Sequence, residues 1–367
     1  MRAPVQRPVV IAAGGTGGHF FPAEALAAAL LARGERVVLL TDARSGGLSS
    51  AVFANAERHV IAGAGLSGRS LRSALEGALA LAKGVFQARK ILRALQPGVV
   101  VAFGGYPAVP PVVAAVLLGR RPRIFLHEQN AVLGRANRLL ARFCDVLVLS
   151  FAKTSAVPAG VKTVLLGNPV RPAVAALHGQ GYAPPDGKIE LLILGGSLGA
   201  KVFGSLMPQA LALLPAALRA RLVVSQQCRV EELGAARVAL KDAGIEAELA
   251  PFFNDVAARL QRAHLVIARA GASSVAEIAV AGRPAIFIPL PSAIDDHQRA
   301  NADALVDAHA AWRLDQVGLS AQALADKIES ILMKPETLVT AAQAAASAGR
   351  ADAAERLAGL VMEGVGA

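Results

Sequence analysis

Residues 8–19 read PVVIAAGGTGGH, an apolar run that leads directly into a glycine-rich turn ending in a histidine. A helix-like stretch, residues 22–33, follows the turn. A strand, a glycine turn and a helix in this order bring a backbone and a helix N-terminus close to a ligand in α/β proteins. The glycines allow close approach, and His19 would offer the ligand an imidazole that titrates near neutral pH.

A second glycine turn, GGSLGA at residues 195–200, follows another apolar run halfway along the chain. Two such openings predict two similar domains with a cleft between them. We expect an N-terminal domain over residues 1–168 and a C-terminal domain over residues 169–340. Residues 341–367 are expected to form a C-terminal helix that packs back on the first domain. The turn at residues 167–172 and the Gly/Pro-rich residues 178–188 are the expected link.

Strand-like runs alternate with amphipathic stretches throughout, which predicts an α/β fold with parallel sheets buried on both faces. In the first half, strands are expected near residues 9–13, 36–41, 99–103, 123–128, 146–150 and 163–166. In the second half, they are expected near residues 189–194, 222–225, 247–250, 265–268 and 285–289.

The composition is that of an ordered globular protein, because 54% of the 367 residues are hydrophobic and 18% are charged. Mean hydropathy is +0.47, yet no uncharged apolar run reaches the roughly 18 residues of a spanning helix. The N-terminus does not resemble a secretory signal. Cys144 and Cys228 show no metal-ligand spacing, which favours a reduced, cytosolic compartment.

Positive charge is concentrated in the first half of the chain. Residues 1–168 hold 20 Lys and Arg against 7 Asp and Glu, whereas residues 169–367 hold 18 against 20. This predicts an anionic partner for the first half, either nucleic acid or an anionic membrane surface. The aromatic content of 4% argues against platforms that stack single-stranded bases.

Polar residues gather where first-half strands end. They belong to the turn FGGYP (103–107) and to HEQN (127–130). The expected set on one sheet edge is His19, Tyr106, His127, Glu128 and Asn130. In the alternative interpretation, His127 and Glu128 satisfy each other structurally. A dinucleotide site is a further alternative, with Asp42 as an imperfect ribose acid, whereas the lysine of a P-loop is missing.

The stretch RAGASSVAE (269–277) predicts a strand end, a turn at Gly271 and a helix start that attracts a phosphate. Glu277 lies three residues after Ser274, so a carboxylate there could accept hydrogen bonds from both ribose hydroxyls. The alternative is a capping box around Ser273 or Ser274.

DDHQ (295–298) opens another helix, with Asn301 one turn later. Sugar binding and ordinary N-capping by the aspartates are the two interpretations. The sequence has no Asp-x-Asp motif that would indicate a metal.

Seven motifs together resemble the MurG family in order and approximate spacing. They are GGTGGH (14–19), FGGYP (103–107), HEQN (127–130), GNPVR (167–171), GGSLGA (195–200), RAGASSVAEI (269–278) and DDHQ (295–298). The resemblance covers roughly residues 9–310. It implies a GT-B fold, in which two Rossmann-like domains face across a cleft.

The resemblance also implies an activity, namely inverting transfer of N-acetylglucosamine from UDP-GlcNAc to the C4 hydroxyl of MurNAc in lipid I. The product would be lipid II for peptidoglycan synthesis. It implies no cofactor, no metal and no nucleic acid. The implied location is peripheral, on the cytoplasmic face of the bacterial inner membrane.

Matching motifs carry roles over to this chain. His19 would be the general base, and Glu128 is the second expected catalytic residue, with Tyr106 and Asn130 as acceptor or sugar contacts. The expected substrate-binding residues include Thr16, Gly17 and Gly18 of the first turn. On the donor side they are Arg171 beside the uracil, Ser197, the Phe253 backbone at the uracil edge, Ser274 at the phosphate, Glu277 at the ribose, and His297 and Gln298 at the sugar. Cys228 replaces a frequent family glycine, which leaves Gln226 and Gln227 without a role.

Residues 66–93 predict a membrane-facing helix. The stripe expected in the core is Ala74, Ala78, Leu81, Val85, Ala88 and Leu92; the second apolar stripe is Leu71, Leu75, Leu79 and Phe86. The basic residues around it are Arg69, Arg72, Lys83, Arg89, Lys90 and Arg93, against the single acid Glu76. Apolar residues ringed by basic ones suit an anionic lipid surface. The alternative is a wholly buried second stripe.

The sequence leaves three alternative functions open. A Rossmann oxidoreductase would bind nicotinamide or flavin, and a basic RNA-binding protein would lack an ordered catalytic set. A UDP-sugar epimerase would share the fold and the donor but would need no lipid acceptor.

Overall fold

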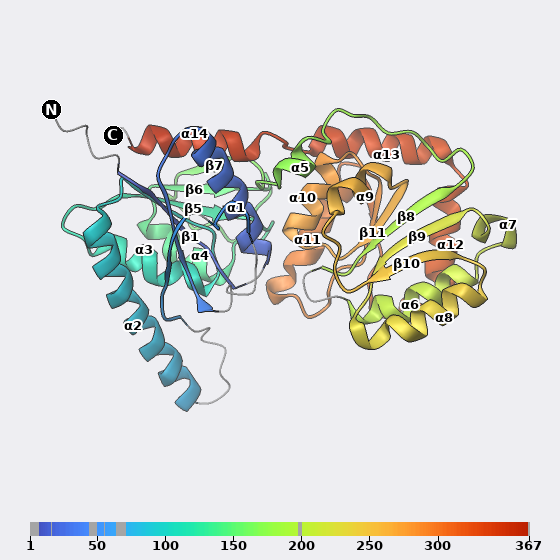
Figure 1. Ribbon diagram of the computed structural model, residues 1–367, viewed down its shortest axis with the longest axis horizontal. Helices are drawn as coiled ribbons and strands as arrows, with labels where there is room; N and C mark the ends of the chain where they lie inside the picture. The colour runs from blue at the N-terminus through green and yellow to red at the C-terminus, as the bar shows by residue number, and fades with distance from the viewer. Residues whose placement is uncertain are drawn as a thin grey trace. The chain divides into compact units, whose positions relative to one another are not determined.

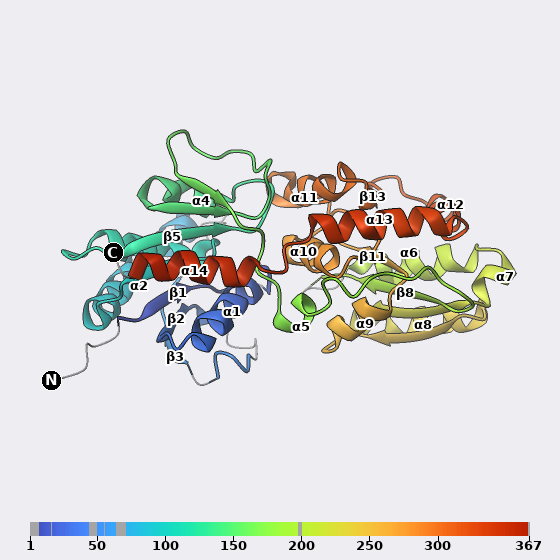
Figure 2. The same ribbon diagram turned by 90° about the horizontal axis from the view of Figure 1, so that it is seen from above.

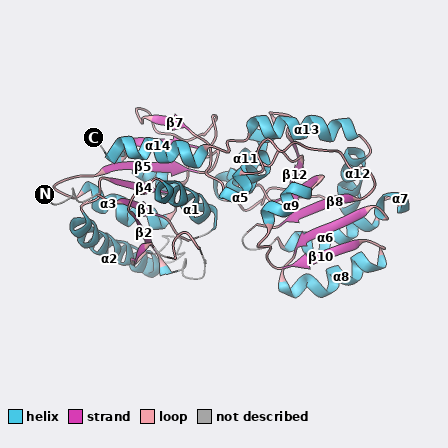
Figure 3. Cartoon of the chain, turned by 45° about the horizontal axis from the view of Figure 1, so that its top comes forward, coloured by secondary structure: helices cyan, strands magenta, loops and turns pink. Residues whose placement is uncertain are grey.

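The computed structural model describes residues 7–15, 17–43, 50–54, 56–63, 71–196 and 200–365. The chain divides into two compact units. Unit 1 comprises Met1–Arg171 and Asp352–Ala367, and unit 2 comprises Pro172–Ala351. In each unit, helices cover both faces of one parallel sheet, as Figures 1 and 3 show.

Unit 1 is built on a seven-stranded sheet in the order β3-β2-β1-β4-β5-β6-β7, in which every pair is parallel. The strands are β1 (Val9–Ala12), β2 (Val37–Thr41), β3 (Glu57–Val60), β4 (Val99–Ala102), β5 (Arg123–Glu128), β6 (Val146–Leu149) and β7 (Thr163–Leu165). The helices are α1 (Gly17–Ala32), α2 (Leu71–Leu95), α3 (Val109–Val116), α4 (Arg135–Leu140) and α14 (Ala353–Val365), with 3₁₀ turns η2 (Tyr106–Ala108) and η3 (Ala141–Phe143).

Alternation along the strands of unit 1 divides its core between the two faces of the sheet. Val9 and Ile11 pack with α1 and α14 on one face. Val10 and Ala12 pack with α2, α3 and α4 on the other. Since successive side chains of a strand point to opposite faces, these apolar runs require helices on both sides. Helices packed on both faces hold the strands of the sheet in place, and with them the edge at which the strands end.

Unit 2 has a six-stranded parallel sheet in the order β10-β9-β8-β11-β12-β13. The strands are β8 (Ile189–Leu194), β9 (Leu222–Gln227), β10 (Glu246–Ala250), β11 (Leu265–Ala268), β12 (Ala285–Phe287) and β13 (Ala311–Arg313). The helices are α5 (Pro172–Ala175), α6 (Lys201–Ala212), α7 (Ala216–Arg219), α8 (Leu233–Asp242), α9 (Val256–Arg262), α10 (Ala272–Val280), α11 (His297–Val306), α12 (Ala321–Leu332) and α13 (Pro335–Ala348), with 3₁₀ turns η4 (Val230–Glu232) and η5 (Ile294–Asp296). An apolar cluster of unit 2 joins β8 to α6 and α12 through Ile193, Phe203 and Ile328.

The C-terminal region differs from the single helix expected over residues 341–367. α13 ends at Ala348, and its C-cap Gly349 has extended backbone; a Cβ at Gly349 would come within 2.8 Å of the backbone of Ala279 and Val280, so only glycine fits there. The chain then enters unit 1 as α14, which lies beside α1 (Figure 2). Leu357 and Val361 of α14 are fully buried in the core of unit 1. The units separate after Arg171, three residues beyond the expected boundary.

The second apolar stripe of α2 is exposed where the structure describes it, which contradicts the alternative that the whole stripe is buried. Leu75, Leu79 and Phe86 are 63%, 62% and 73% exposed, which excludes that interpretation for these residues of unit 1. Ala88 and Leu92 are buried as expected, whereas Ala78 is exposed. Residues 64–70, which include Arg69, and the side chains of Leu71, Arg72 and Ala74 lie outside the described part of the chain.

Candidate active site

The first glycine turn connects β1 to α1 and is tied to a neighbouring strand. Gly15 has a left-handed backbone with φ of +83°, and its N–H donates to Oδ1 of Asp42 at 3.1 Å. The hydroxyl of Tyr106 donates to the other oxygen of Asp42. Asp42 is buried, and its two carboxylate oxygens join the glycine turn to Tyr106. A ribose acid would instead direct these oxygens to a ligand. Gly17 and Gly18 begin α1, while Thr16 lies outside the described residues.

His19 is half-buried in the first turn of α1 and reaches the end of β5. Its Nδ1 lies 3.0 Å from Oε1 of Gln129. The amide nitrogen of Gln129 lies 3.1 Å from Nδ1 of His127. Because β1, β4 and β5 are neighbours in the sheet, their carboxyl ends meet at one edge. The predicted convergence of His19, Tyr106 and the β5 residues is thus found within unit 1. Gln129 was not predicted, because its partner is 110 residues away in the sequence.

His127 is fully buried and does not pair with Glu128, so that alternative is wrong. Its Nε2 donates to the carbonyl oxygen of Gly167 at 3.1 Å. Burial lowers the pKa of His127 to about 4, since a buried imidazole loses the hydration of its charged form. His127 is therefore a neutral structural residue at physiological pH.

Glu128 organises the loop that follows β5. One carboxylate oxygen accepts hydrogen bonds from the backbone and side-chain nitrogens of Asn130, at 3.0 and 3.1 Å. The other accepts from the Gly134 N–H and from the Asn137 side chain, both at 2.9 Å. With 2% of its surface exposed, Glu128 shapes the loop that presents Asn130. These contacts favour a supporting role over direct proton transfer.

Gly195, which begins the second glycine turn, bonds to one of the two glutamines that had no assigned role. Gln227 accepts a hydrogen bond from the Gly195 N–H at 3.2 Å and donates to the Pro251 carbonyl at 3.1 Å. Gln226 is buried and donates to the Phe203 carbonyl at 2.9 Å. Cys228 is buried beside them, and burial raises the pKa of its thiol. Gln226 and Gln227 thus end β9 rather than form a loop, and Gln227 ties Gly195 to this strand end, whereas Ser197 lies outside the described residues.

The turn after β11 presents the start of α10. Gly271 is the N-cap, and Ser273 and Ser274 lie inside the helix. A capping box needs a side chain at the N-cap, so that alternative for Glu277 is wrong. Arg269 donates to the carbonyls of Ile288 and Pro289 at 2.8 and 3.1 Å. Asn301 donates to the carbonyl of Ala270 at 3.0 Å and so fixes the same turn.

Glu277 is 8% exposed and shares a helix face with Ser274.

The start of α11 lies after the neighbouring strand β12. Asp295 and Asp296 both have positive φ, at 54° and 51°. Asp296 pairs with Arg299 at 2.9 Å and, although it is the N-cap of α11, its side chain makes no capping bond, so ordinary N-capping by Asp296 is wrong. His297 donates from Nδ1 to the Ile294 carbonyl at 2.7 Å, and Gln298 accepts from the Leu290 N–H at 3.0 Å.

Two aromatic contacts hold the residues expected at the uracil. The guanidinium of Arg259 stacks 3.8 Å from the ring centre of Phe253 and is itself held by Glu248, through two hydrogen bonds of 2.7 Å. In unit 1, Arg171 lies 5.3 Å from the ring centre of Phe21 on α1. Each side chain is thus supported by its own unit.

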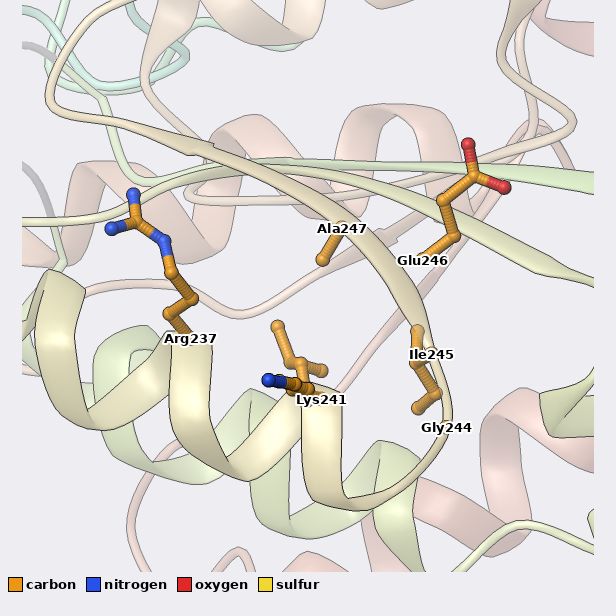
Figure 4. A pocket seen from close by; sticks show the side chains of 7 residues that line it. Arg237, Lys241, Gly244, Ile245, Glu246 and Ala247 are labelled. Atoms are coloured by element: carbon orange, nitrogen blue, oxygen red, sulfur yellow. The ribbon is translucent and has the colours of Figure 1, made fainter.

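A hollow of about 410 Å³ lies elsewhere in unit 2, between α8 and β10 (Figure 4). Arg237 and Lys241 of α8 line it together with Glu246, which pairs with Lys188 at 2.8 Å. None of the predicted site residues lines this hollow. No group of three or more possible metal ligands occurs among the residues described, and none of the described helices is long and apolar enough to cross a membrane.

Two family models match the chain, one within unit 1 and one over most of unit 2 and the start of α14. The glycosyltransferase family 28 N-terminal domain matches residues 9–149, and the family 28 C-terminal domain matches residues 190–357. Together they span the strand ends, the glycine turns and α10.

Curated relatives match nearly the whole chain. A protein of Granulibacter bethesdensis is 59% identical over 98% of this chain and 94% of its own length. One of Acidiphilium cryptum is 56% identical over 100% of this chain and 99% of its own length. Both are named UDP-N-acetylglucosamine–N-acetylmuramyl-(pentapeptide) pyrophosphoryl-undecaprenol N-acetylglucosamine transferase.

The crystal structure of MurG from Acinetobacter baumannii is similar in both sequence and fold. It is 31% identical, has a TM-score of 0.78 and is matched over 97% of this chain and 99% of that chain. The predicted GT-B fold, with two Rossmann-like domains, is confirmed. The chain belongs to the MurG family of glycosyltransferases.

Proposed function

We propose that this protein transfers N-acetylglucosamine from UDP-GlcNAc to the C4 hydroxyl of MurNAc in lipid I, with inversion, and so forms lipid II. The observation that carries the proposal is the His19 imidazole, held by Gln129 at the carboxyl edge of the unit 1 sheet. The names of relatives that are 59% and 56% identical supply the substrate classes.

His19 acts as the general base in this proposal. Its Nε2 takes the proton of the C4 hydroxyl while the hydroxyl oxygen bonds to C1 of GlcNAc. The bond between C1 and the diphosphate oxygen breaks, and UDP leaves with that electron pair. One displacement inverts the anomeric carbon, so a single base suffices.

Unit 2 holds the donor in this proposal. Glu277 accepts hydrogen bonds from the ribose hydroxyls, Ser274 contacts the phosphate, and the N-terminus of α10 stabilises the negative charge of the leaving UDP. His297 and Gln298 bind the sugar, and the Phe253 backbone binds the uracil edge. Ser197 also contacts the donor, and Arg171, the last residue of unit 1 before unit 2 begins, flanks the uracil.

Unit 1 receives the acceptor in this proposal. Thr16, Gly17 and Gly18 let it approach the backbone closely. Tyr106 and Asn130 contact it, and Glu128 supports Asn130 by shaping the loop that presents it.

We further propose that α2 docks unit 1 on the cytoplasmic face of the inner membrane. The exposed Leu75, Leu79 and Phe86 would enter the interface. The basic residues of the same helix whose side chains the structure describes would meet anionic headgroups, namely Lys83, Arg89, Lys90 and Arg93. A lipid acceptor whose polyprenyl tail stays in the bilayer requires an enzyme that works at that surface.

The decisive experiment follows labelled GlcNAc from UDP-GlcNAc into a lipid I analogue, without added metal. We expect a disaccharide-lipid product and one UDP per transfer. A parallel incubation with UDP-GlcNAc alone, read by NMR, tests the epimerase alternative. Epimerised nucleotide sugar without any lipid product would overturn the proposal.

A further inference from the structure

Gln129 joins two histidines in a continuous chain of hydrogen bonds. Its Oε1 lies 3.0 Å from Nδ1 of His19. Its Nε2 lies 3.1 Å from Nδ1 of His127 and 3.2 Å from the His127 carbonyl oxygen. Nε2 of His127 lies 3.1 Å from the Gly167 carbonyl oxygen. Gln129 itself is 1% exposed, so these partners define its environment.

The direction of every hydrogen bond in this chain follows from its buried end. The Gly167 carbonyl can only accept, so Nε2 of His127 carries a proton. Burial lowers the pKa of His127 to about 4, so the neutral ring carries no second proton and its Nδ1 accepts. The group facing Nδ1 must therefore be the NH₂ of Gln129.

A second contact fixes the same amide orientation independently. The nitrogen of Gln129 also faces the His127 carbonyl oxygen, which can only accept. A flipped amide would place two carbonyl oxygens against each other in a buried site. The oxygen of Gln129 therefore faces His19, and it can only accept, so Nδ1 of His19 donates.

We propose that Gln129 is a positioning residue that holds His19 in the Nδ1-protonated tautomer and leaves the Nε2 lone pair available for the acceptor hydroxyl. The catalytic meaning rests on the proposed function, whereas the tautomer is a property of the free protein. Which ring nitrogen of a histidine is protonated is set by the hydrogen bond of the other. In this protein the neutral amide of Gln129, which is itself oriented by the neutral His127, determines the tautomer of His19.

Gly105 provides the space that this tautomer needs. Its φ is +66°, and a Cβ at this position would lie 3.2 Å from both Nε2 and Cδ2 of His19. A side chain here would crowd the edge of the ring that carries the lone pair. Glycine thus leaves that edge accessible, whereas Gln129 occupies the opposite one.

The pH dependence of the base has identifiable contributors. The titratable groups on the elements around His19 are His127 and Glu128 at the end of β5, Tyr106 in η2 and Asp42 after β2. Of these, Tyr106 and Asp42 bond to each other, and Glu128 bonds to its own loop. The neutral Gln129 therefore contacts His19 without adding a charge. A carboxylate at position 129 would favour the imidazolium.

The test reads the tautomer directly by ¹⁵N NMR of the histidine rings in the full-length protein. The chain has seven histidines, and His19→Ala identifies the His19 signals. In the wild-type protein we expect a protonated Nδ1 and an unprotonated Nε2 at His19. A protonated Nε2 in the neutral ring would overturn the proposal, whether or not any variant folds.

Two substitutions then connect the tautomer to the rate. Gln129→Met removes the acceptor, so we expect mixed tautomers and a kcat lower by roughly 10-fold or more, with a smaller change in KM. Gln129→Glu keeps an acceptor but adds charge, so the acid limb of the kcat profile should move to higher pH by on the order of 1 unit. Loss of packing alone would not move that limb.

A matched control separates this role from general stability. Gln226→Met removes a buried amide of unit 2 that bonds to the Phe203 carbonyl, so it should leave the His19 tautomer and the acid limb unchanged. A wild-type tautomer and rate in Gln129→Met would overturn the positioning role. Absence of GlcNAc transfer by the wild-type protein would instead overturn the proposed function, and the NMR result would still decide the tautomer.

Discussion

His19 is the residue whose chemistry the proposed reaction needs most. His19→Ala should lower kcat by roughly 100-fold or more, because a general base usually contributes that much. UDP affinity, measured by calorimetry, should stay close to wild type because the imidazole acts on the acceptor proton. His59→Ala is the matched control, since His59 bonds to Glu57 on an edge strand. Unchanged turnover in His19→Ala would remove this residue from the mechanism.

Glu277 is the corresponding residue on the donor side. Glu277→Ala should weaken UDP binding by about 1–3 kcal/mol, because buried ribose hydroxyls would lose their acceptor. The helix start should survive, since its N-cap is Gly271. Calorimetric titration with UDP measures the change, and Glu246→Ala, which breaks an exposed ion pair with Lys188, is the control. Equal UDP affinity in Glu277→Ala and the wild-type protein would refute the ribose assignment.

At the scale of elements, the end of α2 carries a testable strain. Gln96 follows the last residue of α2 with a φ of +46°, and its N–H donates to the Leu92 carbonyl at 2.9 Å. Glycine adopts this left-handed conformation freely, so Gln96→Gly should raise the free energy of unfolding by about 1 kcal/mol. Urea denaturation measures this, and Gln96→Ala should bring no such gain. Equal effects of the two substitutions would contradict the strain.

The sequence predicts buried strands better than edge strands. The runs at β1, β4, β6 and β11 are apolar throughout because helices cover both faces of each sheet, so their pattern can be seen in the sequence alone. β3 reads ERHV and is mostly exposed, and β13 has three residues. Both are edge strands whose pairing depends on a neighbour rather than on their own composition.

In the site, too, local sequence patterns could be predicted and long-range contacts could not. Polar residues after apolar strands indicated His19, Tyr106 and the β5 end, because parallel strands bring their carboxyl ends together. The role of Gln129 could not be predicted, since it depends on the folded structure placing the amide oxygen beside His19 and the amide nitrogen beside His127. A dinucleotide motif would make Asp42 a ribose acid, whereas the structure shows it bonded to Gly15 and Tyr106.

At the scale of the whole molecule, the proposed membrane docking predicts lipid-dependent sedimentation. Binding to anionic vesicles should weaken at high salt, because each basic residue near the surface contributes about 1 kcal/mol that salt screens. Leu75→Glu or Leu79→Glu should reduce binding further. Val238→Glu is the control, because it changes a similarly exposed apolar residue of unit 2. Equal binding to neutral and anionic vesicles, or none to either, would contradict this docking surface.

The order of the chain also sets a schedule for its synthesis. Unit 1 includes α14, so the face of its sheet that contains Val9 and Ile11 lacks part of its cover while Pro172–Ala351 is being made. A ribosome adding roughly 5–20 residues per second needs on the order of 10–40 s for that interval. Unit 2 can complete its fold only as this interval ends, and the earlier-made unit 1 waits throughout it with apolar surface uncovered. The nascent chain is therefore most vulnerable to chaperone capture and proteolysis in the half that emerged first.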